Sequence, residues 1–118
     1  MNISKSKSFI QSLHTSTKRN YIERMINDKV HCSNVASLYG KEYWDGERKY
    51  GYGGYHYIPG RWHNLASKLI NEYNLNKTSK VLDIGCGKGY LIKEFKLLIP
   101  ELEINGLDIS SYAIKNSH

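Results

Sequence analysis

The amino-acid sequence predicts an α/β fold built on a parallel sheet, and three observations carry this prediction. The run Val81-Leu82-Asp83-Ile84 is short, contains β-branched residues and is flanked by turn residues, as a strand would be. A helical spacing of apolar residues follows a glycine-rich turn and stops at Pro100. A second strand-like run covers residues 102–108. Strand, helix and strand form one βαβ unit, so the two strands are parallel and the crossover is right-handed.

Length and composition limit the chain to one small domain. It has 118 residues, of which 40% are hydrophobic and 24% charged, as is usual for a globular protein. Its longest aliphatic run, Leu97-Leu98-Ile99, is too short for a membrane span or a secretory signal. Cys32 and Cys86 have no cysteine or histidine at zinc-ligand spacing. We therefore expect no disulfide framework, no metal site and a reducing, cytoplasmic location.

The net charge of +6 is unevenly distributed along the chain. Residues 1–30 hold six basic and two acidic side chains, whereas residues 81–118 hold four basic and five acidic ones. A basic patch attracts polyanions, but scattered lysines are more typical of a solvated face. Nucleic-acid binding is thus an alternative that the charge alone does not favour.

Residues 1–58 are predicted to form an extension made of helices and loops. Thr17 is the predicted N-cap of a first helix, because the residues that follow it place apolar side chains at helical spacing: Tyr21, Ile22, Met25 and Ile26. A second helix is predicted over residues 32–39. Gly40 is its predicted C-cap, since glycine readily adopts the positive φ of that position.

Glycine and tyrosine alternate across residues 40–60, a segment with six glycines. This glycine density argues against any helix in the segment. Two interpretations stay open for it. It is either an ordered surface loop whose rings pack on the domain, or an aromatic flap that covers a ligand pocket.

Residues 59–118 are predicted to form the α/β domain itself. Six apolar side chains share one face of a helix that starts after Gly60: Trp62, Leu65, Ala66, Leu69, Ile70 and Tyr73. A further helix over residues 91–99 connects the two strands. Ser110 or Ser111 is the expected N-cap of a last helix.

The turn after the first strand reads Asp83-Ile84-Gly85-Cys86-Gly87-Lys88-Gly89-Tyr90. Its three glycines allow a tight strand-to-helix turn whose backbone can contact a ligand at the carboxyl edge of the sheet. Asp108 ends the next strand, where a carboxylate can accept hydrogen bonds from the hydroxyls of a ribose. The pattern therefore indicates a cofactor that contains a nucleoside.

The spacing of the glycines distinguishes between such cofactors. A dinucleotide-binding turn requires Gly or Ala at position 90, where this chain has Tyr90. A phosphate-binding loop requires a lysine after its last glycine, and Gly89 is not followed by one. Asp83 precedes the first glycine by two residues, where its charge would repel a pyrophosphate but attract the ammonium and sulfonium groups of S-adenosylmethionine.

The segment resembles the cofactor-binding part of the class I S-adenosylmethionine-dependent methyltransferases, whose first motif is similar to VLDIGCGKGY and whose second ends in an acid, as in GLDIS. The resemblance covers about residues 60–118 and implies S-adenosylmethionine as the cofactor. It implies that Asp83 holds the methionine ammonium, that Asp108 binds the ribose hydroxyls and that Ile109 packs on the adenine. The glycines that would cradle the cofactor are Gly85, Gly87 and Gly89.

The extension resembles that of a bacterial subgroup of these enzymes, through LHTSTKRNYIERM, YWDGERKYGYGGYHY and GRWH in residues 13–63. The Rossmann-like parallel sheet of the family has seven strands, so the resemblance implies a sheet truncated after its second strand. Catalytic residues are then expected beyond residue 118, and the sequence identifies none within the chain.

Four other side chains are weaker candidates for a functional role. His56 and His63 are suited to general-base work near neutral pH, although surface or packing roles are commoner for such residues. Arg61 could pair with the carboxylate of the cofactor. Cys86 lies at a helix N-terminus, which can lower a thiol pKa, but a small residue that fills the turn is the simpler interpretation.

The predicted function is an S-adenosylmethionine-dependent methyltransferase, or the N-terminal part of one, that acts on a small-molecule or glycan-type acceptor. An RNA or protein methyltransferase is the enzyme alternative, because the N-terminal segment is basic. A non-catalytic cofactor-binding remnant or interaction module is the other alternative, because the chain is short. No membrane partner is expected, and the sequence predicts no oligomeric state.

Overall fold

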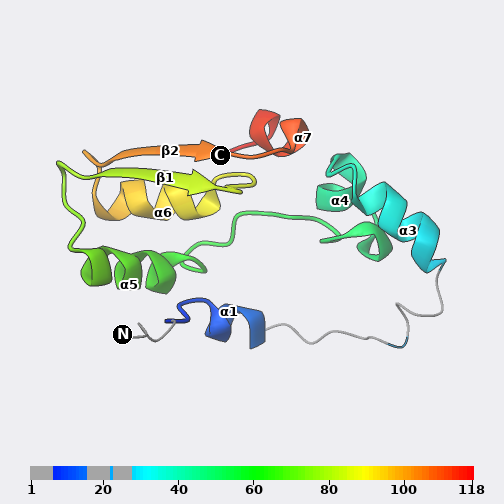
Figure 1. The fold of residues 1–118 in the computed structure, drawn as a ribbon, viewed down its shortest axis with the longest axis horizontal. Helices are drawn as coiled ribbons and strands as arrows, with labels where there is room; N and C mark the ends of the chain where they lie inside the picture. The colour runs from blue at the N-terminus through cyan, green and yellow to red at the C-terminus, as the bar shows by residue number, and fades with distance from the viewer. Residues whose placement is uncertain (1–6, 16–21, 23–27) are drawn as a thin grey trace, which may run out of the picture.

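The computed structural model describes residues 7–15, 22 and 28–118. The described residues of the N-terminal part include the short α-helices α1 (Gln11–Thr15), α3 (Lys29–Ala36) and α4 (Lys41–Asp45) and the 3-10 helix η1 (Arg48–Tyr50). The C-terminal part alternates helices and strands: α5 (His63–Tyr73), β1 (Lys80–Ile84), α6 (Tyr90–Leu98), β2 (Glu103–Leu107) and α7 (Ser111–Lys115). Figure 1 shows both parts, with α6 lying along the two strands.

The two strands form a parallel sheet, as the sequence predicts. Val81 is opposite Ile104, and both side chains face the helices, where Ala66 of α5 and Phe95 of α6 form the core together with Leu102. Leu102 and Ala66 are completely buried. The prediction of an α/β fold with a Rossmann-like βαβ unit is confirmed, and its core lies between α5, α6 and one face of the sheet.

The other face of the sheet is bare in the described part of the chain. Leu82 and Ile84 of β1 and Leu107 of β2 have exposed fractions of 54%, 78% and 57%. They share this face because side chains alternate along a strand and Ile84 is directly opposite Leu107. Three large apolar side chains in adjacent positions therefore remain in contact with water.

The helices of the C-terminal part begin and end where local chemistry predicts. The predicted helix after Gly60 forms as α5 and ends at Asn74, which adopts the left-handed conformation with φ +50°. The hydroxyl of Ser110 accepts a hydrogen bond of 3.0 Å from the N–H of Ala113, and so caps α7. The prediction of a cap at Ser110 or Ser111 is confirmed for Ser110.

Two predictions for the N-terminal part are wrong. The helix predicted over residues 32–39 begins earlier, where the carboxylate of Asp28 accepts from the N–H of His31 at 3.2 Å, and ends before Ser37. Gly40 therefore does not cap it and instead precedes α4 in an extended conformation. Residues 40–60 also contain α4 and η1, although no helix was expected there, because Gly40 and Gly46 flank α4 without interrupting it. The helix predicted after Thr17 lies outside the described residues, apart from Ile22.

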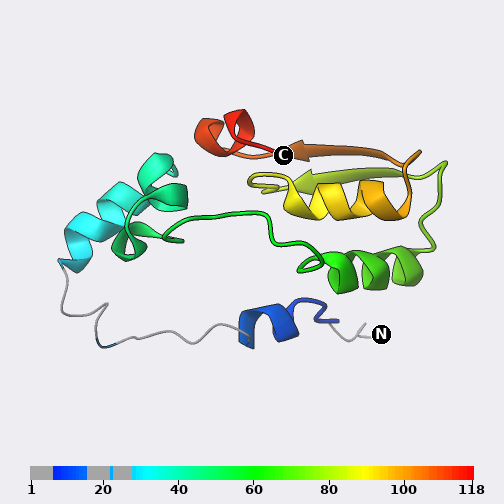
Figure 2. The same ribbon diagram turned by 180° about the vertical axis from the view of Figure 1, so that it is seen from behind.

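The extension meets the sheet at the carboxyl ends of its strands. Figure 2, seen from behind, shows the same arrangement as Figure 1, with α4 beyond the strand ends and next to α7, and α3 farther from the sheet. Direct contacts join α4 to α7 and α3 to both α4 and η1. The glycine turn lies at the same edge of the sheet. Among the described residues, no helix has the length and apolar character needed to cross a bilayer.

Candidate functional site

The glycine turn is fastened to the end of β2 by its own backbone. The N–H groups of Gly85 and Cys86 both donate to the carbonyl oxygen of Leu107, at 2.7 and 3.1 Å. Gly85, Gly87 and Gly89 have φ values of +84°, +56° and +76°, which L-residues with a Cβ rarely adopt. The sequence prediction of a tight strand-to-helix turn is confirmed, and Gly89 immediately precedes α6.

The three glycines differ in what surrounds them. A Cβ added at Gly85 or Gly89 would meet no atom within 4 Å, so the turn is open at both positions. A Cβ at Gly87 would lie only 2.9 Å from the indole of Trp44. Gly87 is thus needed for packing against the extension, whereas the turn at Gly85 and Gly89 leaves room for a ligand to approach the backbone.

Asp83 lies in β1, immediately before this turn, and is half-buried. In the part of the chain that the structure describes, no hydrogen-bond donor and no cation pairs with its carboxylate. Burial, and then the negative charge of Asp108, raise the pKa of Asp83. Two neighbouring carboxylates with no cation between them form a negatively charged edge that a positively charged ligand would stabilise.

Asp108 holds the turn through its side chain. Its Oδ2 accepts a 2.7 Å hydrogen bond from the N–H of Gly87, and its Oδ1 accepts one of the same length from the N–H of Ser110. Each carboxylate oxygen keeps a further lone pair that a ribose hydroxyl could use. Ile109 is 86% exposed next to it, so its side chain is free to pack on a flat ring. The roles predicted for both residues remain predictions.

Cys86 fills space inside the turn. Its Sγ lies 2.6 Å from the position that a Cβ at Gly106 would occupy, so the two residues are complementary in size. Burial, and then the charges of Asp83 and Asp108, raise the pKa of the Cys86 thiol. This direction is opposite to that of a reactive thiolate and favours the packing interpretation.

The extension is anchored to the turn by a buried ion pair that the sequence did not suggest. Lys88, between the second and third glycines, is 5% exposed. Its ammonium donates to both carboxylate oxygens of Asp45, at 2.8 and 2.7 Å, and to the carbonyl oxygen of Tyr55 at 2.9 Å. Asp45 also accepts from the hydroxyl of Tyr112 at 2.8 Å. One carboxylate therefore joins α4, the glycine turn and α7.

Asp45 remains ionised well below neutral pH. Burial acts to raise its pKa, but hydrogen bonds from Lys88, from the N–H of Tyr55 and from Tyr112 outweigh burial and lower the pKa to about 2. Trp44, the neighbouring residue, donates from Nε1 to the hydroxyl of Ser110 at 2.9 Å. Both side chains thus bond the start of α7, and Asp45 also bonds the glycine turn.

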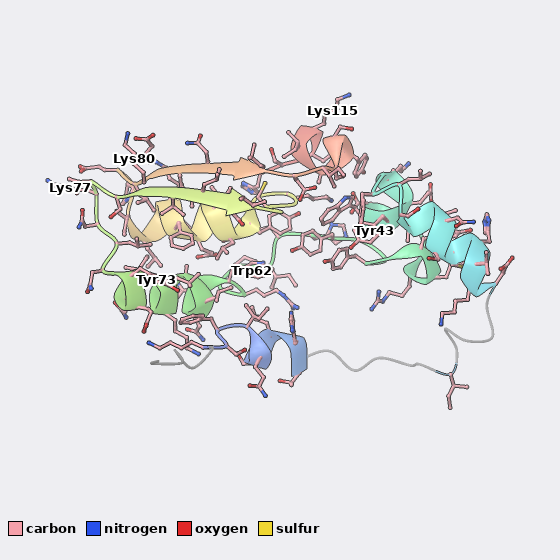
Figure 3. The ribbon with its side chains drawn as sticks, viewed as in Figure 1. Tyr43, Trp62, Tyr73, Lys77, Lys80 and Lys115 are labelled. Atoms are coloured by element: carbon pink, nitrogen blue, oxygen red, sulfur yellow. The ribbon has the colours of Figure 1, made fainter. Side chains whose placement is uncertain are left out.

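The Tyr/Gly-rich segment is an ordered loop whose rings pack on the domain. The N–H groups of Tyr52 and Gly54 donate to the carbonyl oxygens of Tyr43 and Trp44, at 2.9 and 3.1 Å. The ring of Tyr55 stacks on that of Tyr90 with centroids 5.1 Å apart. Figure 3 shows Tyr43 among the side chains gathered at this end of the molecule. These contacts agree with the first of the two interpretations, while closure over a ligand remains a prediction.

Burial keeps two of these tyrosines in the protonated phenol form. It is the largest cause that raises the pKa of Tyr43 and that of Tyr55, each to about 12. Both phenols are therefore protonated at neutral pH. They can offer a ring face and a hydroxyl donor to a ligand, but they do not act as phenolate bases.

The two histidine candidates lie in different surroundings. Nδ1 of His63 is 3.8 Å from Oε2 of Glu94, a carboxylate that also accepts from the hydroxyl of Tyr57 at 2.7 Å. His56 and Arg61 line a pocket on the outer side of the loop. Across residues 7–15, 22 and 28–118, no group of three His, Cys, Asp or Glu side chains is placed to hold a metal ion.

Comparison with known proteins decides the family of the βαβ segment. Residues 75–118, which contain β1, the glycine turn, β2 and α7, match a protein family described as a methyltransferase domain. This segment is similar to the class I methyltransferases. The recognition made from the glycine spacing, Asp83 and Asp108 is confirmed; the bacterial subgroup suggested by the extension stays a prediction.

Curated methyltransferases match the chain over short stretches. A malonyl-[acyl-carrier protein] O-methyltransferase from Bacillus anthracis is 33% identical over 52 residues, which is 44% of this chain and 19% of that protein. Ribosomal RNA small subunit methyltransferase C from Vibrio parahaemolyticus is 43% identical over 54 residues, which is 46% of this chain and 16% of that protein. The matches thus span less than a fifth of these relatives. No solved structure matches the chain significantly.

Proposed function

We propose that the chain is the cofactor-binding part of an S-adenosylmethionine-dependent methyltransferase that acts on a small-molecule or glycan-type acceptor in the cytoplasm. Residues 1–58 form the extension and residues 59–118 the beginning of the methyltransferase domain. The methyltransferase family of residues 75–118 supports the reaction class. One relative is named for a malonyl-[acyl-carrier protein] substrate, which agrees with an acceptor other than nucleic acid.

The observation that carries the choice of cofactor is the carboxylate of Asp83, which lies near Asp108 and has no partner among the described residues. S-adenosylmethionine carries an ammonium and a sulfonium, which two carboxylates stabilise, whereas the pyrophosphate of a dinucleotide would be repelled. In the proposed complex Asp83 holds the ammonium, Asp108 binds the ribose hydroxyls and Ile109 packs on the adenine. The open backbone at Gly85 and Gly89 lets the cofactor approach the turn.

Calorimetric titration tests this assignment. S-adenosylhomocysteine, the demethylated product, keeps the ammonium and the ribose and should bind in preference to NAD. Asp108→Asn should weaken its binding about 10-fold, since about 1.4 kcal/mol is lost when a charge-assisted hydrogen bond becomes a neutral one. Glu101→Gln is the control, because it removes an exposed carboxylate that lies away from the turn. This variant should bind S-adenosylhomocysteine as tightly as the wild type does. Tighter binding of NAD would refute the proposal.

RNA is the second candidate acceptor. It is favoured by the net charge of +6 and by the relative that is named for ribosomal RNA. Electrophoretic mobility shifts with a structured RNA, measured at 50 and 200 mM salt, discriminate between the two candidates. Salt-sensitive binding in the micromolar range would favour RNA over the small-molecule acceptor.

A further inference from the structure

The pocket lined by His56 and Arg61 lies apart from the glycine turn, between α1, the Tyr/Gly-rich loop and the start of α5. Its volume is about 410 Å³, within the range of small-molecule sites. Three aromatic rings form much of its wall: Tyr52, Tyr55 and Trp62. Figure 3 shows Trp62 at the beginning of α5. We refer to this cavity as the outer pocket.

The outer pocket is positively charged. Arg48 and Arg61 line it, as do His14 and His56, and none of the described lining residues is Asp or Glu. Within residues 7–15, 22 and 28–118, neither guanidinium forms an ion pair. Two arginines at one cavity, neither paired with an acid in the described part of the chain, favour an anionic ligand.

The walls of the outer pocket are held in place before any ligand binds. The guanidinium of Arg48 donates to the carbonyl oxygen of Gly51, and its side chain passes under Gly53, where a Cβ would lie 3.0 Å from it. The ring of Tyr52 stacks on Trp44 with an interplanar angle of 15°, and Tyr55 stacks on Tyr90 at 19°. Rings and cations fixed in this way bind a ligand with little loss of conformational entropy.

We propose that the outer pocket binds a phosphorylated ring compound of about the size of a nucleotide or a sugar phosphate. The rings of Tyr52, Tyr55 and Trp62 offer faces on which a base or a sugar packs. Arg48 and Arg61 offer the bidentate N–H pairs that phosphate oxygens accept. A phosphate dianion has more acceptor oxygens than a carboxylate. It can therefore accept more of the hydrogen bonds that two guanidiniums and two imidazoles donate. The ligand is separate from the methyl donor proposed above.

Phenyl phosphate is a suitable probe, because it combines a ring with a phosphate and nothing else. Ligand-observed saturation-transfer NMR with the whole chain gives its dissociation constant, compared with those of phenyl β-glucoside, inorganic phosphate and benzoate. We expect phenyl phosphate to bind at least 10-fold more tightly than each of the other three. If phenyl β-glucoside bound as tightly as phenyl phosphate, the ligand would not need a negative charge, and the proposal would be overturned. If benzoate bound as tightly as phenyl phosphate, the pocket would not prefer a phosphate to a carboxylate, and the proposal would again be overturned.

Arg61→Gln and Arg48→Gln test the two guanidiniums separately. Each should weaken phenyl phosphate at least 5-fold, whereas Lys115→Gln removes an exposed charge on α7 and should leave the binding unchanged. Arg61 makes no side-chain hydrogen bond within the described residues, so its replacement tests charge without disturbing the loop. Wild-type affinity in Arg61→Gln would refute the proposal.

Competition with S-adenosylhomocysteine separates this inference from the proposed function. Saturating S-adenosylhomocysteine should leave phenyl phosphate bound. Displacement would mean that the outer pocket is one end of the cofactor site and would overturn the inference. If S-adenosylhomocysteine does not bind at all, the proposed function fails, while bound phenyl phosphate would still support the outer pocket.

Discussion

Lys88 and Asp45 form a buried ion pair across 43 residues of sequence, with the ammonium 2.8 and 2.7 Å from the two carboxylate oxygens. Lys88 belongs to the glycine turn and Asp45 to the end of α4. The pair therefore fixes the extension against the segment that we propose to bind the cofactor. Because the side chain of Lys88 is directed into this contact, it is not directed toward the open side of the turn at Gly85 and Gly89.

Removing the charge of Asp45 should destabilise the protein strongly. Asp45→Asn leaves the ammonium of Lys88 buried without a counter-charge, which typically reduces the free energy of unfolding by about 3–5 kcal/mol. Replacing both residues, as Asp45→Asn with Lys88→Met, should be less damaging than Asp45→Asn alone. Chemical denaturation of both single variants and the double variant measures the coupling. Strictly additive effects would mean that the pair contributes nothing specific.

The same pair predicts an acid-sensitive contribution to stability. The pKa of Asp45 is lowered to about 2, so its contribution is complete above the ordinary pKa of an aspartate, about 4, and is lost as the pH falls toward about 2. The difference in unfolding free energy between wild type and Asp45→Asn should therefore shrink between these two pH values. A difference that stays constant down to pH 2 would contradict this assignment.

Gly87 should be more sensitive to substitution than a glycine with similar φ in open space. Gly87→Ala combines a left-handed backbone conformation with a methyl group 2.9 Å from the indole of Trp44. Gly60→Ala, at φ +77° and with no atom within 4 Å, has only the backbone penalty of about 1–2 kcal/mol. In a Trp62→Phe background, Trp44 is the single tryptophan, and its fluorescence should shift to the red in Gly87→Ala. Equal destabilisation by both variants, with no spectral shift, would exclude a packing role.

The bare face of the sheet should bind a hydrophobic dye. Leu82 and Leu107 are exposed side chains on the same face. Leu82→Thr and Leu107→Thr together should reduce the fluorescence of bound anilinonaphthalene sulfonate by at least half. Leu38→Thr, at a more exposed site (78%) two residues after α3, is the control. An unchanged signal in the double variant would place the dye elsewhere.

The α/β part could be predicted from sequence because its signals are local. The apolar spacing of α5, the stop at Pro100 and the cap at Ser110 each depend on a few neighbouring residues. The same holds for the turn, since Gly85 and Gly89 need their positive φ whatever surrounds them.

The contacts of the extension could not be predicted in this way. Lys88 is typical of a solvated lysine in sequence, and its partner lies 43 residues earlier. The requirement at Gly87 comes from Trp44, which is equally distant in sequence. Gly40 and Gly46 suggested a loop, although a five-residue helix fits between them.

Two-dimensional ¹H–¹⁵N NMR during a titration with S-adenosylhomocysteine tests the cofactor site most directly, because it identifies the binding residues one by one. The proposal predicts saturable shifts of the amide signals of Gly85 and Gly89, and of those of Asp108 and Ile109, with Asp83→Asn reducing the affinity. Signals of α3, such as that of Asn34, should not move. Shifts confined to residues outside the turn and the end of β2, or no shifts at millimolar ligand, would contradict it.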